Sequence, residues 1–162
     1  MRLYIIRHAW AEDPDDRRWP DDSARPLTSD GIKRFRCVAE KLGERGCRPT
    51  LIASSPYVRA WQTAELLVKH LGCDPRLARL DALECGSDLA AALAWTAEQD
   101  ADELAWVGHM PDVALFVARL IGDGTAQIEF AKGAIAALDF PARPALGLGV
   151  LRWFATAKVL GC

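Results

Sequence analysis

The chain has 162 residues, of which 51% are hydrophobic and 26% charged, and its formal net charge is −2 at pH 7. The length predicts one domain, residues 1–162, with a sizeable core, and the composition is ordinary for a soluble globular protein. Without a basic surplus, the chain lacks the cations by which nucleic-acid binders release counterions from phosphates. No apolar run approaches the roughly 20 residues of a membrane span or the length of a signal-peptide core. We therefore expect no nucleic-acid partner, no membrane partner and a cytoplasmic location.

The cysteines are five in number and scattered, with no C-x-x-C pair: Cys37, Cys47, Cys73, Cys85 and Cys162. This usage agrees with a reducing compartment. None of them lies in a motif that would activate a thiol nucleophile. We expect all of them to be small core or surface residues.

The first expected element is a short buried strand at residues 3–6, which is apolar and ends in two β-branched isoleucines. It runs directly into Arg7 and His8. Residues 11–26 show no periodicity and are rich in charges and prolines, so we predict a long surface loop there. Thr28 is placed to cap a helix that continues to about residue 45.

The middle of the chain continues with short apolar runs and helical patterns. After a predicted strand at residues 50–54, Ser55 and Pro56 are the expected cap and first residue of a second helix. Residues 77–83 form a weak strand or loop segment, and a third helix is predicted at residues 88–98.

The last third of the chain completes the pattern. A strand is predicted at residues 103–107, and a helix begins at Pro111. Residues 133–140 and 149–155 are predicted strands with no helix between them, which favours an antiparallel pair. The whole order predicts an α/β fold. We expect a three-layer α/β/α sandwich with a mostly parallel central sheet and an antiparallel C-terminal strand pair.

Three of the predicted strands end at polar side chains. The first ends at Arg7 and His8, the second opens a helix whose first turn carries Arg59, and the strand at residues 103–107 ends at His109. The carboxyl ends of parallel strands share one edge of a sheet, so we expect these side chains and two helix N-termini to converge. Arginine forks bind phosphate oxygens bidentately, and helix N-termini offer free amides. The predicted volume therefore favours a phosphoryl group.

Within that volume His8 is the expected nucleophile, because a neutral imidazole can attack phosphorus and carry the phosphoryl group covalently. Arg7, Arg59 and His109 are expected to hold its equatorial oxygens in the transition state. Because these groups supply the charge, we expect no magnesium and no other cofactor. We also expect no metal site, since the histidines lack H-x-x-H or H-x-x-x-H spacing and Arg7 repels a cation.

The same residues carry a resemblance to a known family. In chain order the motifs are Arg7-His8, Arg25-Pro26-Leu27-Thr28 with Gly31, Ser54-Ser55-Pro56 with Arg59, and Val107-Gly108-His109. Together they resemble the histidine phosphatase superfamily, whose fold is phosphoglycerate-mutase-like. The short chain and the segment Phe130-x-x-Gly133-Ala134-Ile135 are most similar to SixA-type phosphohistidine phosphatases. The resemblance implies a role in signal transduction, transient phosphorylation of His8, and phosphoryl binding by Arg7, Arg59 and His109.

The chain departs from the family pattern in two places. The family's usual sequence Arg-His-Gly is Arg7-His8-Ala9 in this chain, and the methyl group of Ala9 can narrow the pocket. The acidic proton donor of many relatives has no clean counterpart, and Glu84 and Asp81 are both candidates for it or for solvated loop carboxylates. Arg25 is open between a substrate contact and a loop salt bridge.

The weakly defined donor bears on the substrate. An alcohol is a poor leaving group, so a general acid is worth about 10²–10⁴ in rate for a phosphate ester. The imidazole that leaves phosphohistidine has a conjugate acid with a pKa of about 6.5 and needs little help.

We therefore expect a metal-independent phosphatase that acts as a monomer on protein phosphohistidine, for example on a histidine-phosphotransfer protein. Two alternatives stay open: a small-molecule phosphomonoesterase of the same superfamily, and a non-catalytic phosphate-binding module.

Overall fold

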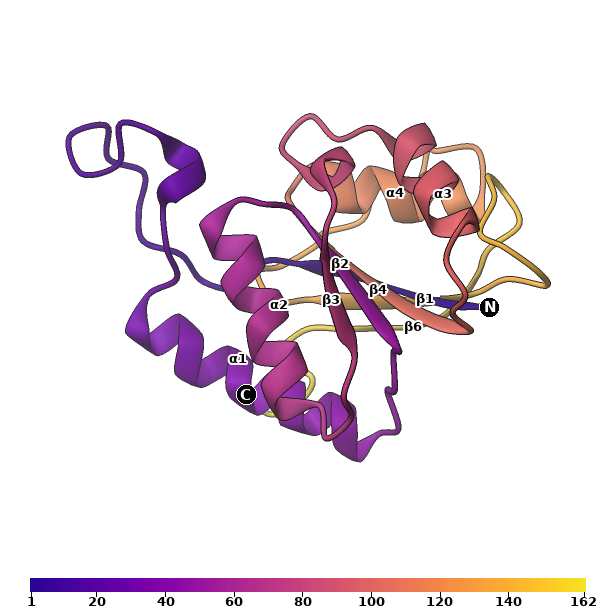
Figure 1. Cartoon of the computed structure of the whole chain (residues 1–162), viewed down its shortest axis with the longest axis horizontal. Coiled ribbons are helices and arrows are strands. Elements are labelled where there is room, and N and C mark those ends of the chain that lie inside the picture. The colour runs from indigo at the N-terminus through magenta and orange to yellow at the C-terminus, as the bar shows by residue number, and fades with distance from the viewer.

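In the computed structural model, which describes residues 1–162, a six-stranded sheet has the strand order β3-β2-β4-β1-β5-β6 (Figure 1). Four strands are parallel to one another: β1 (Arg2–Arg7), β2 (Leu51–Ser54), β3 (Arg76–Arg79) and β4 (Glu103–Gly108). Two more form an antiparallel pair, of which β5 (Ile135–Asp139) also runs antiparallel to β1, and β6 (Val150–Ala155) forms the edge. The predicted mostly parallel sheet with an antiparallel C-terminal pair is confirmed.

Helices cover both faces of this sheet, two on each (Figure 1). On one face lie α1 (Ser29–Glu44) and α2 (Val58–His70), and on the other lie α3 (Leu89–Ala97) and α4 (Asp112–Ile121). The predicted three-layer sandwich is therefore confirmed. No helix combines the length and apolar character that crossing a membrane requires.

The side-chain alternation of the central strands feeds two hydrophobic clusters, one under each helix pair. In β1, Tyr4 and Ile6 join the cluster of α1 and α2, while Leu3 and Ile5 join the cluster of α3 and α4. Since both faces of the strand are buried, its sequence is a continuous apolar run rather than an alternating one. Each such side chain contributes about 1.5–3 kcal/mol by leaving water.

The start of α1 follows the predicted cap. Thr28 Oγ1 accepts a hydrogen bond from the Gly31 amide at 2.9 Å. A Cβ atom at residue 31 would collide with the main-chain carbonyl of Trp10. Glycine is therefore needed there to let the strand-end segment approach the helix closely.

The start of α2 differs from the prediction. The helix begins at Val58, its N-cap is Tyr57, and no side chain caps it. Ser55 therefore does not cap the helix, and Pro56 is not its first residue. The Ser55 hydroxyl is instead bonded to His109, and it accepts the Tyr57 amide at 3.3 Å. The Ser55 side chain therefore faces the segment that follows β4.

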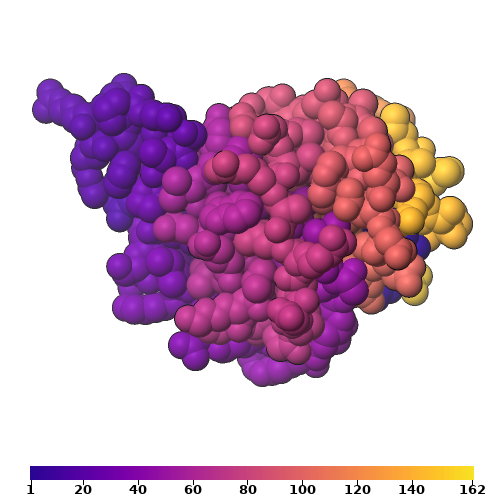
Figure 2. All heavy atoms as spheres, viewed as in Figure 1, coloured from indigo at the N-terminus to yellow at the C-terminus, as the bar shows by residue number.

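The predicted loop at residues 11–26 is confirmed as a mostly irregular segment. It contains one short 3₁₀ turn, η1 (Asp22–Ala24), and a single bridge between Ala11 and Leu27. In the space-filling view this indigo segment protrudes from the body of the molecule (Figure 2). The weak segment at residues 77–83 contains β3 and a second 3₁₀ turn, η2 (Asp81–Leu83).

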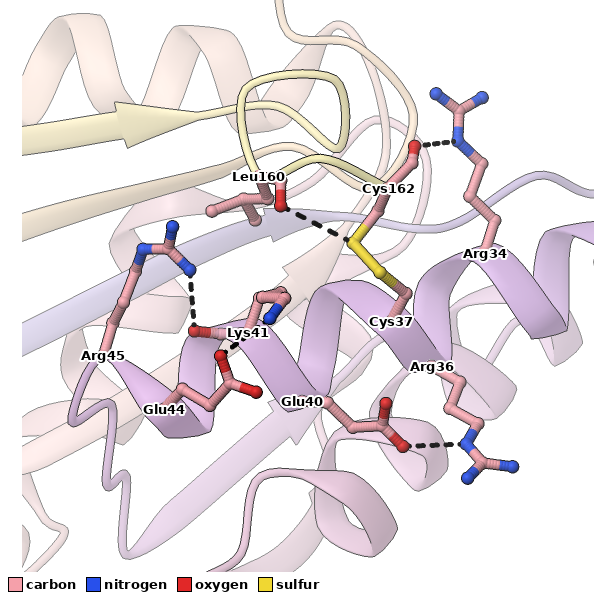
Figure 3. The surroundings of a disulfide bond; sticks show 9 residues. All are labelled: Arg34, Arg36, Cys37, Glu40, Lys41, Glu44, Arg45, Leu160 and Cys162. Atoms are coloured by element: carbon pink, nitrogen blue, oxygen red, sulfur yellow. Dashed lines mark hydrogen bonds and ion pairs between the residues drawn. A yellow bond between two sulfur atoms is a disulfide. The ribbon is translucent and has the colours of Figure 1, made fainter.

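The expectation for the cysteines is wrong for two of them. Cys37 of α1 and Cys162 form a disulfide across 125 residues of sequence (Figure 3). After β6 the chain returns over α1, where Arg34 Nε donates to the Cys162 carbonyl at 3.1 Å. The return brings the two cysteine Cα atoms within 5.9 Å of each other. Cys47, Cys73 and Cys85 are free thiols.

Candidate active site

The polar side chains at the ends of β1, β2 and β4 converge at one edge of the sheet, as predicted. The His8 amide donates to the Gly108 carbonyl at 3.0 Å, and the Ser55 amide donates to the Val107 carbonyl at 3.0 Å. These bonds continue the sheet pairing beyond the strand ends and fix the three segments side by side. The His8 and His109 rings consequently lie with their centroids 5.2 Å apart.

The ring of His8 is held in one tautomer. Its Nδ1 lies 2.7 Å from the Ala9 carbonyl oxygen, which can only accept, so Nδ1 carries the proton and Nε2 carries a lone pair. Burial lowers the pKa of His8 to about 3, and the nearby His109, Arg59 and Arg7 act in the same direction. The ring is therefore neutral at pH 7, with Nε2 available as a nucleophile.

His109 is almost completely buried, and its ring lies close to those of His8 and Tyr57. Its centroid lies 5.0 Å from that of Tyr57, and its Nε2 lies 2.8 Å from the Ser55 hydroxyl. Burial, assisted by the charge of Arg59, lowers the pKa of His109 to about 3. This ring is also neutral at pH 7.

Arg59 lies in the first turn of α2 and is 3% exposed. Its Nη1 donates to the Asp22 carbonyl at 2.7 Å, and its Nη2 lies 3.0 Å from Asp22 Oδ2 and 3.7 Å from Cys85 Sγ. Its guanidinium carbon lies 5.1 Å from the centre of the Tyr57 ring, a cation–π distance. Arg7 donates from Nη1 to the Phe130 carbonyl at 2.8 Å, and burial lowers its pKa.

Unpartnered polar atoms mark where a ligand would bind. Only four buried side-chain nitrogens or oxygens in the protein have no hydrogen-bond partner. Three of them are Arg7 Nε, Arg59 Nε and His109 Nδ1, and the fourth is Trp19 Nε1. A buried polar group without a partner costs about 1–3 kcal/mol. Three of these four atoms belong to residues that are predicted to bind the phosphoryl group. This arrangement fits a bound molecule that offers several acceptor oxygens.

Ala9 belongs to the core and not to the pocket. It is fully buried and packs in the hydrophobic cluster beneath α1 and α2. Its amide donates to Thr63 Oγ1 at 3.0 Å, and that hydroxyl donates to the Arg59 carbonyl at 2.7 Å. The expectation that its methyl group narrows the pocket is therefore wrong. Thr63 ties the end of β1 to the first turn of α2.

The two candidate proton donors lie together. Glu84 and Asp81 both line a surface hollow of about 460 Å³, together with Tyr57 and Arg79. Tyr57 lines this hollow and also contacts the ring of His109. Neither carboxylate hydrogen-bonds to a residue of the site, so both line the hollow as free acceptors.

Arg25 forms the loop salt bridge that was one of its two alternatives. Its Nε lies 2.7 Å from Asp22 Oδ1, and its Nη1 donates to the Glu12 carbonyl at 2.7 Å. Through Asp22 it is connected to Arg59. A direct contact between Arg25 and substrate stays a prediction.

Four residues that contact the predicted set were given no role in the site from the sequence: Ser55, Tyr57, Thr63 and Asp22. Ser55 belongs to the motif Ser54-Ser55-Pro56, but its position just before the predicted second helix indicated a role as helix cap. Asp22 is one of several acidic residues in an aperiodic loop, and nothing in that pattern singles it out.

The model of the histidine phosphatase superfamily, branch 1, matches residues 3–114. An uncharacterised protein of Picosynechococcus sp. is 38% identical over 117 residues, which are 70% of this chain and 68% of that protein. The probable phosphoglycerate mutase GpmB of Proteus mirabilis is 36% identical over 85 residues, which are 50% of this chain and 39% of that mutase.

Solved structures extend the likeness to the whole chain. The protein histidine phosphatase SixA complexed with tungstate has a TM-score of 0.84 and 27% identity, with 99% of each chain covered. A protein of Agrobacterium tumefaciens provisionally identified as phosphohistidine phosphatase SixA has a TM-score of 0.77 and 25% identity, with 96% of this chain and 97% of that chain covered. This chain belongs to the histidine phosphatase superfamily, branch 1, and has its phosphoglycerate-mutase-like fold.

Proposed function

We propose that this protein is a metal-independent phosphatase that removes the phosphoryl group from phosphohistidine on a protein, through a phosphohistidine intermediate on His8. The observation that carries the proposal is a neutral, buried His8 whose Nε2 is free, beside unpartnered donors of Arg7, Arg59 and His109. The likeness to SixA, whose structure holds the phosphate-shaped anion tungstate, supports it.

In the first step, His8 Nε2 attacks the phosphorus of a substrate phosphohistidine whose ring carries a proton on its other nitrogen. A bond forms between Nε2 and phosphorus, the substrate's P–N bond breaks, and the electron pair of that bond leaves with a neutral imidazole. No external proton is needed. The proton on His8 Nδ1 keeps its bond to the Ala9 carbonyl, which stabilises the positive charge that the phosphorylated ring acquires.

In the second step, a water molecule attacks the phosphorus on His8. The P–N bond breaks, its electron pair returns to Nε2, and the dihydrogen phosphate anion leaves with both protons of the water. In both steps Arg7 Nε, Arg59 Nε and His109 Nδ1 donate to the phosphoryl oxygens as charge redistributes.

The role of His109 fixes its tautomer. Phosphoryl oxygens only accept hydrogen bonds, so Nδ1 must carry the proton that it donates. Nε2 then accepts the hydroxyl proton of Ser55 across their 2.8 Å contact. Ser55 is thus a positioning residue for His109.

A panel assay tests this function. The purified protein is incubated with a histidine-phosphorylated carrier protein and, separately, with common phosphate esters, and His8→Ala serves as the blank. We expect the carrier to lose phosphate fastest, with no loss in the blank. Carrier phosphate that stays unchanged after prolonged incubation with wild-type protein would count against the proposal.

A small-molecule phosphomonoesterase is the second candidate, favoured by the two carboxylates in the hollow beside Tyr57. An ester's alcohol needs a proton donor, so in that case Glu84→Gln or Asp81→Asn should lower ester turnover about 10²–10⁴-fold. For a phosphohistidine phosphatase, the same variants should leave phosphohistidine turnover within a few-fold of wild type.

We further propose that residues 1–162 act as one domain, as a monomer and in the cytoplasm. A reducing cytoplasm would hold Cys37 and Cys162 as thiols. Alkylation of thiols in rapidly quenched cells therefore tests the location. A disulfide that resists alkylation under those conditions would argue for an oxidising compartment.

A further inference from the structure

One acidic residue in the protruding loop contacts two arginines at once. Asp22 Oδ1 lies 2.7 Å from Arg25 Nε, and Oδ2 lies 3.0 Å from Arg59 Nη2. The main-chain carbonyl of Asp22 accepts from Arg59 Nη1 at 2.7 Å. The hydrogen bond from Arg25, followed by the charge of Arg59, holds the pKa of this carboxyl below its usual range. Asp22 is therefore ionised at neutral pH.

The contacts leave one part of the Arg59 guanidinium free. A guanidinium has five N–H donors in a single plane. Asp22 binds both terminal nitrogens, whereas Nε is buried and has no partner. These two fixed nitrogens, together with the side-chain stem that joins the guanidinium at Nε, define the plane of the group, so they also determine where the Nε–H bond points.

We propose that Asp22 is a positioning residue that orients Arg59 so that Nε donates to the phosphoryl group; this inference rests on the proposed function. Asp22 acts through Arg59 and does not itself contact the substrate. The other carboxylate oxygen of Asp22, Oδ1, binds Arg25. The turn η1 and the start of α2 therefore determine the orientation of the Arg59 guanidinium together.

The opposite interpretation is that the carboxylate imitates the phosphoryl group and blocks its site. Two observations disfavour it. The Asp22 side chain is 52% exposed and also pairs with Arg25 in its own loop. The donors of Arg7, Arg59 and His109 that lack partners remain without them although Asp22 is in place.

Inorganic phosphate distinguishes these interpretations by the sign of the effect. Removing a negative charge near an anion site tightens anion binding by electrostatics alone. A positioning role predicts the reverse, because a misoriented Arg59 donates poorly. The variants are Asp22→Ala and Asp22→Asn, and the matched control is Asp16→Ala. Asp16 lies in the same loop, has the same charge and makes no side-chain hydrogen bond or ion pair.

The measurement is phosphate affinity by titration calorimetry, with turnover of a phosphohistidine carrier as a second readout. We expect Asp22→Ala to bind phosphate about tenfold more weakly than Asp16→Ala, because the charge-assisted bond from the Asp22 carboxylate to Arg59 Nη2 is lost while the main-chain bond to Nη1 remains. Asp22→Asn keeps an oxygen acceptor and should recover part of the loss. The kcat should fall with phosphate affinity, while the KM for the carrier changes less.

Phosphate binding by Asp22→Ala that equals or exceeds that of Asp16→Ala would overturn the positioning role. If the alanine variant fails to fold, Asp22→Asn against Asp16→Ala decides by the same criterion. Wild-type protein that binds phosphate but leaves phosphohistidine intact refutes the proposed function, while the phosphate comparison still tests Asp22. Wild-type protein that binds no phosphate refutes both.

Discussion

The hydroxyl of Ser55 lies 2.8 Å from Nε2 of His109, and the two residues follow neighbouring parallel strands. The sheet itself therefore brings the serine to the imidazole. The other ring nitrogen of His109, Nδ1, has no partner within the protein. In the proposed reaction it donates to the phosphoryl group, and Ser55 keeps the proton on that nitrogen.

Replacing Ser55 by alanine tests this relationship. We expect Ser55→Ala to lower kcat about tenfold, less than the 10²–10³ that loss of a transition-state donor costs, because His109 remains but samples both tautomers. Nitrogen NMR of the His109 ring should show the tautomer mixture. Ser54→Ala is the control, since that hydroxyl bonds to a backbone carbonyl and not to the ring. Equal losses in the two variants would refute the tautomer role.

The buried histidines predict how stability depends on pH. His8 and His109 bind protons only near pH 3 in the folded protein, but near pH 6.5 in the unfolded chain. Between these values the unfolded state binds more protons, so the free energy of unfolding falls as pH is lowered from 6.5 towards 3. Each histidine contributes about 1.4 kcal/mol per pH unit in this window.

Urea unfolding at pH 7, 6 and 5 measures this dependence. In His8→Asn, which cannot titrate, the slope of unfolding free energy against pH should be smaller by the contribution of one histidine. An unchanged slope in that variant would show that His8 binds protons equally in the folded and unfolded states, which contradicts the lowered pKa of the buried ring.

The convergence of Arg7, His8, Arg59 and His109 could be predicted because it follows from strand direction and local sequence. Each residue stands at the end of a short apolar run or at a helix start, and parallel strands place such ends at one edge. The fold class could be predicted for the same reason, since periodicity and element order are local signals.

The remaining features depend on contacts between distant segments. The pairing of Asp22 with Arg59 spans 37 residues and depends on how an aperiodic loop folds back. Ser55 has a plausible local role as a helix cap, and only the tertiary position of His109 changes it. The Cys37–Cys162 bond depends on the path that the chain takes after β6, and the spacing of the cysteines in the sequence does not reveal that path.

The disulfide predicts an effect on stability that is separate from the chemistry. It closes a long loop between α1 and the last residue, so it restricts the unfolded chain strongly. We expect Cys162→Ser to lower the free energy of unfolding by about 2–5 kcal/mol under oxidising conditions, measured by denaturant titration.

Neither of its cysteines hydrogen-bonds to a residue of the site, so kcat should stay within about twofold of wild type. Cys73→Ser, which removes a free thiol, is the control for the chemical change. Equal stability of Cys162→Ser and Cys73→Ser would indicate that the bond does not restrict the unfolded chain.

Trapping the phosphorylated enzyme tests the central claim most directly. Wild-type protein is mixed with a radiolabelled phosphohistidine carrier, quenched in alkali within milliseconds, and digested to locate the label. We predict an acid-labile, alkali-stable label on His8, which forms before free phosphate appears, and no label in His8→Asn. Release of free phosphate without any label on His8, or undiminished turnover in His8→Asn, would contradict the account.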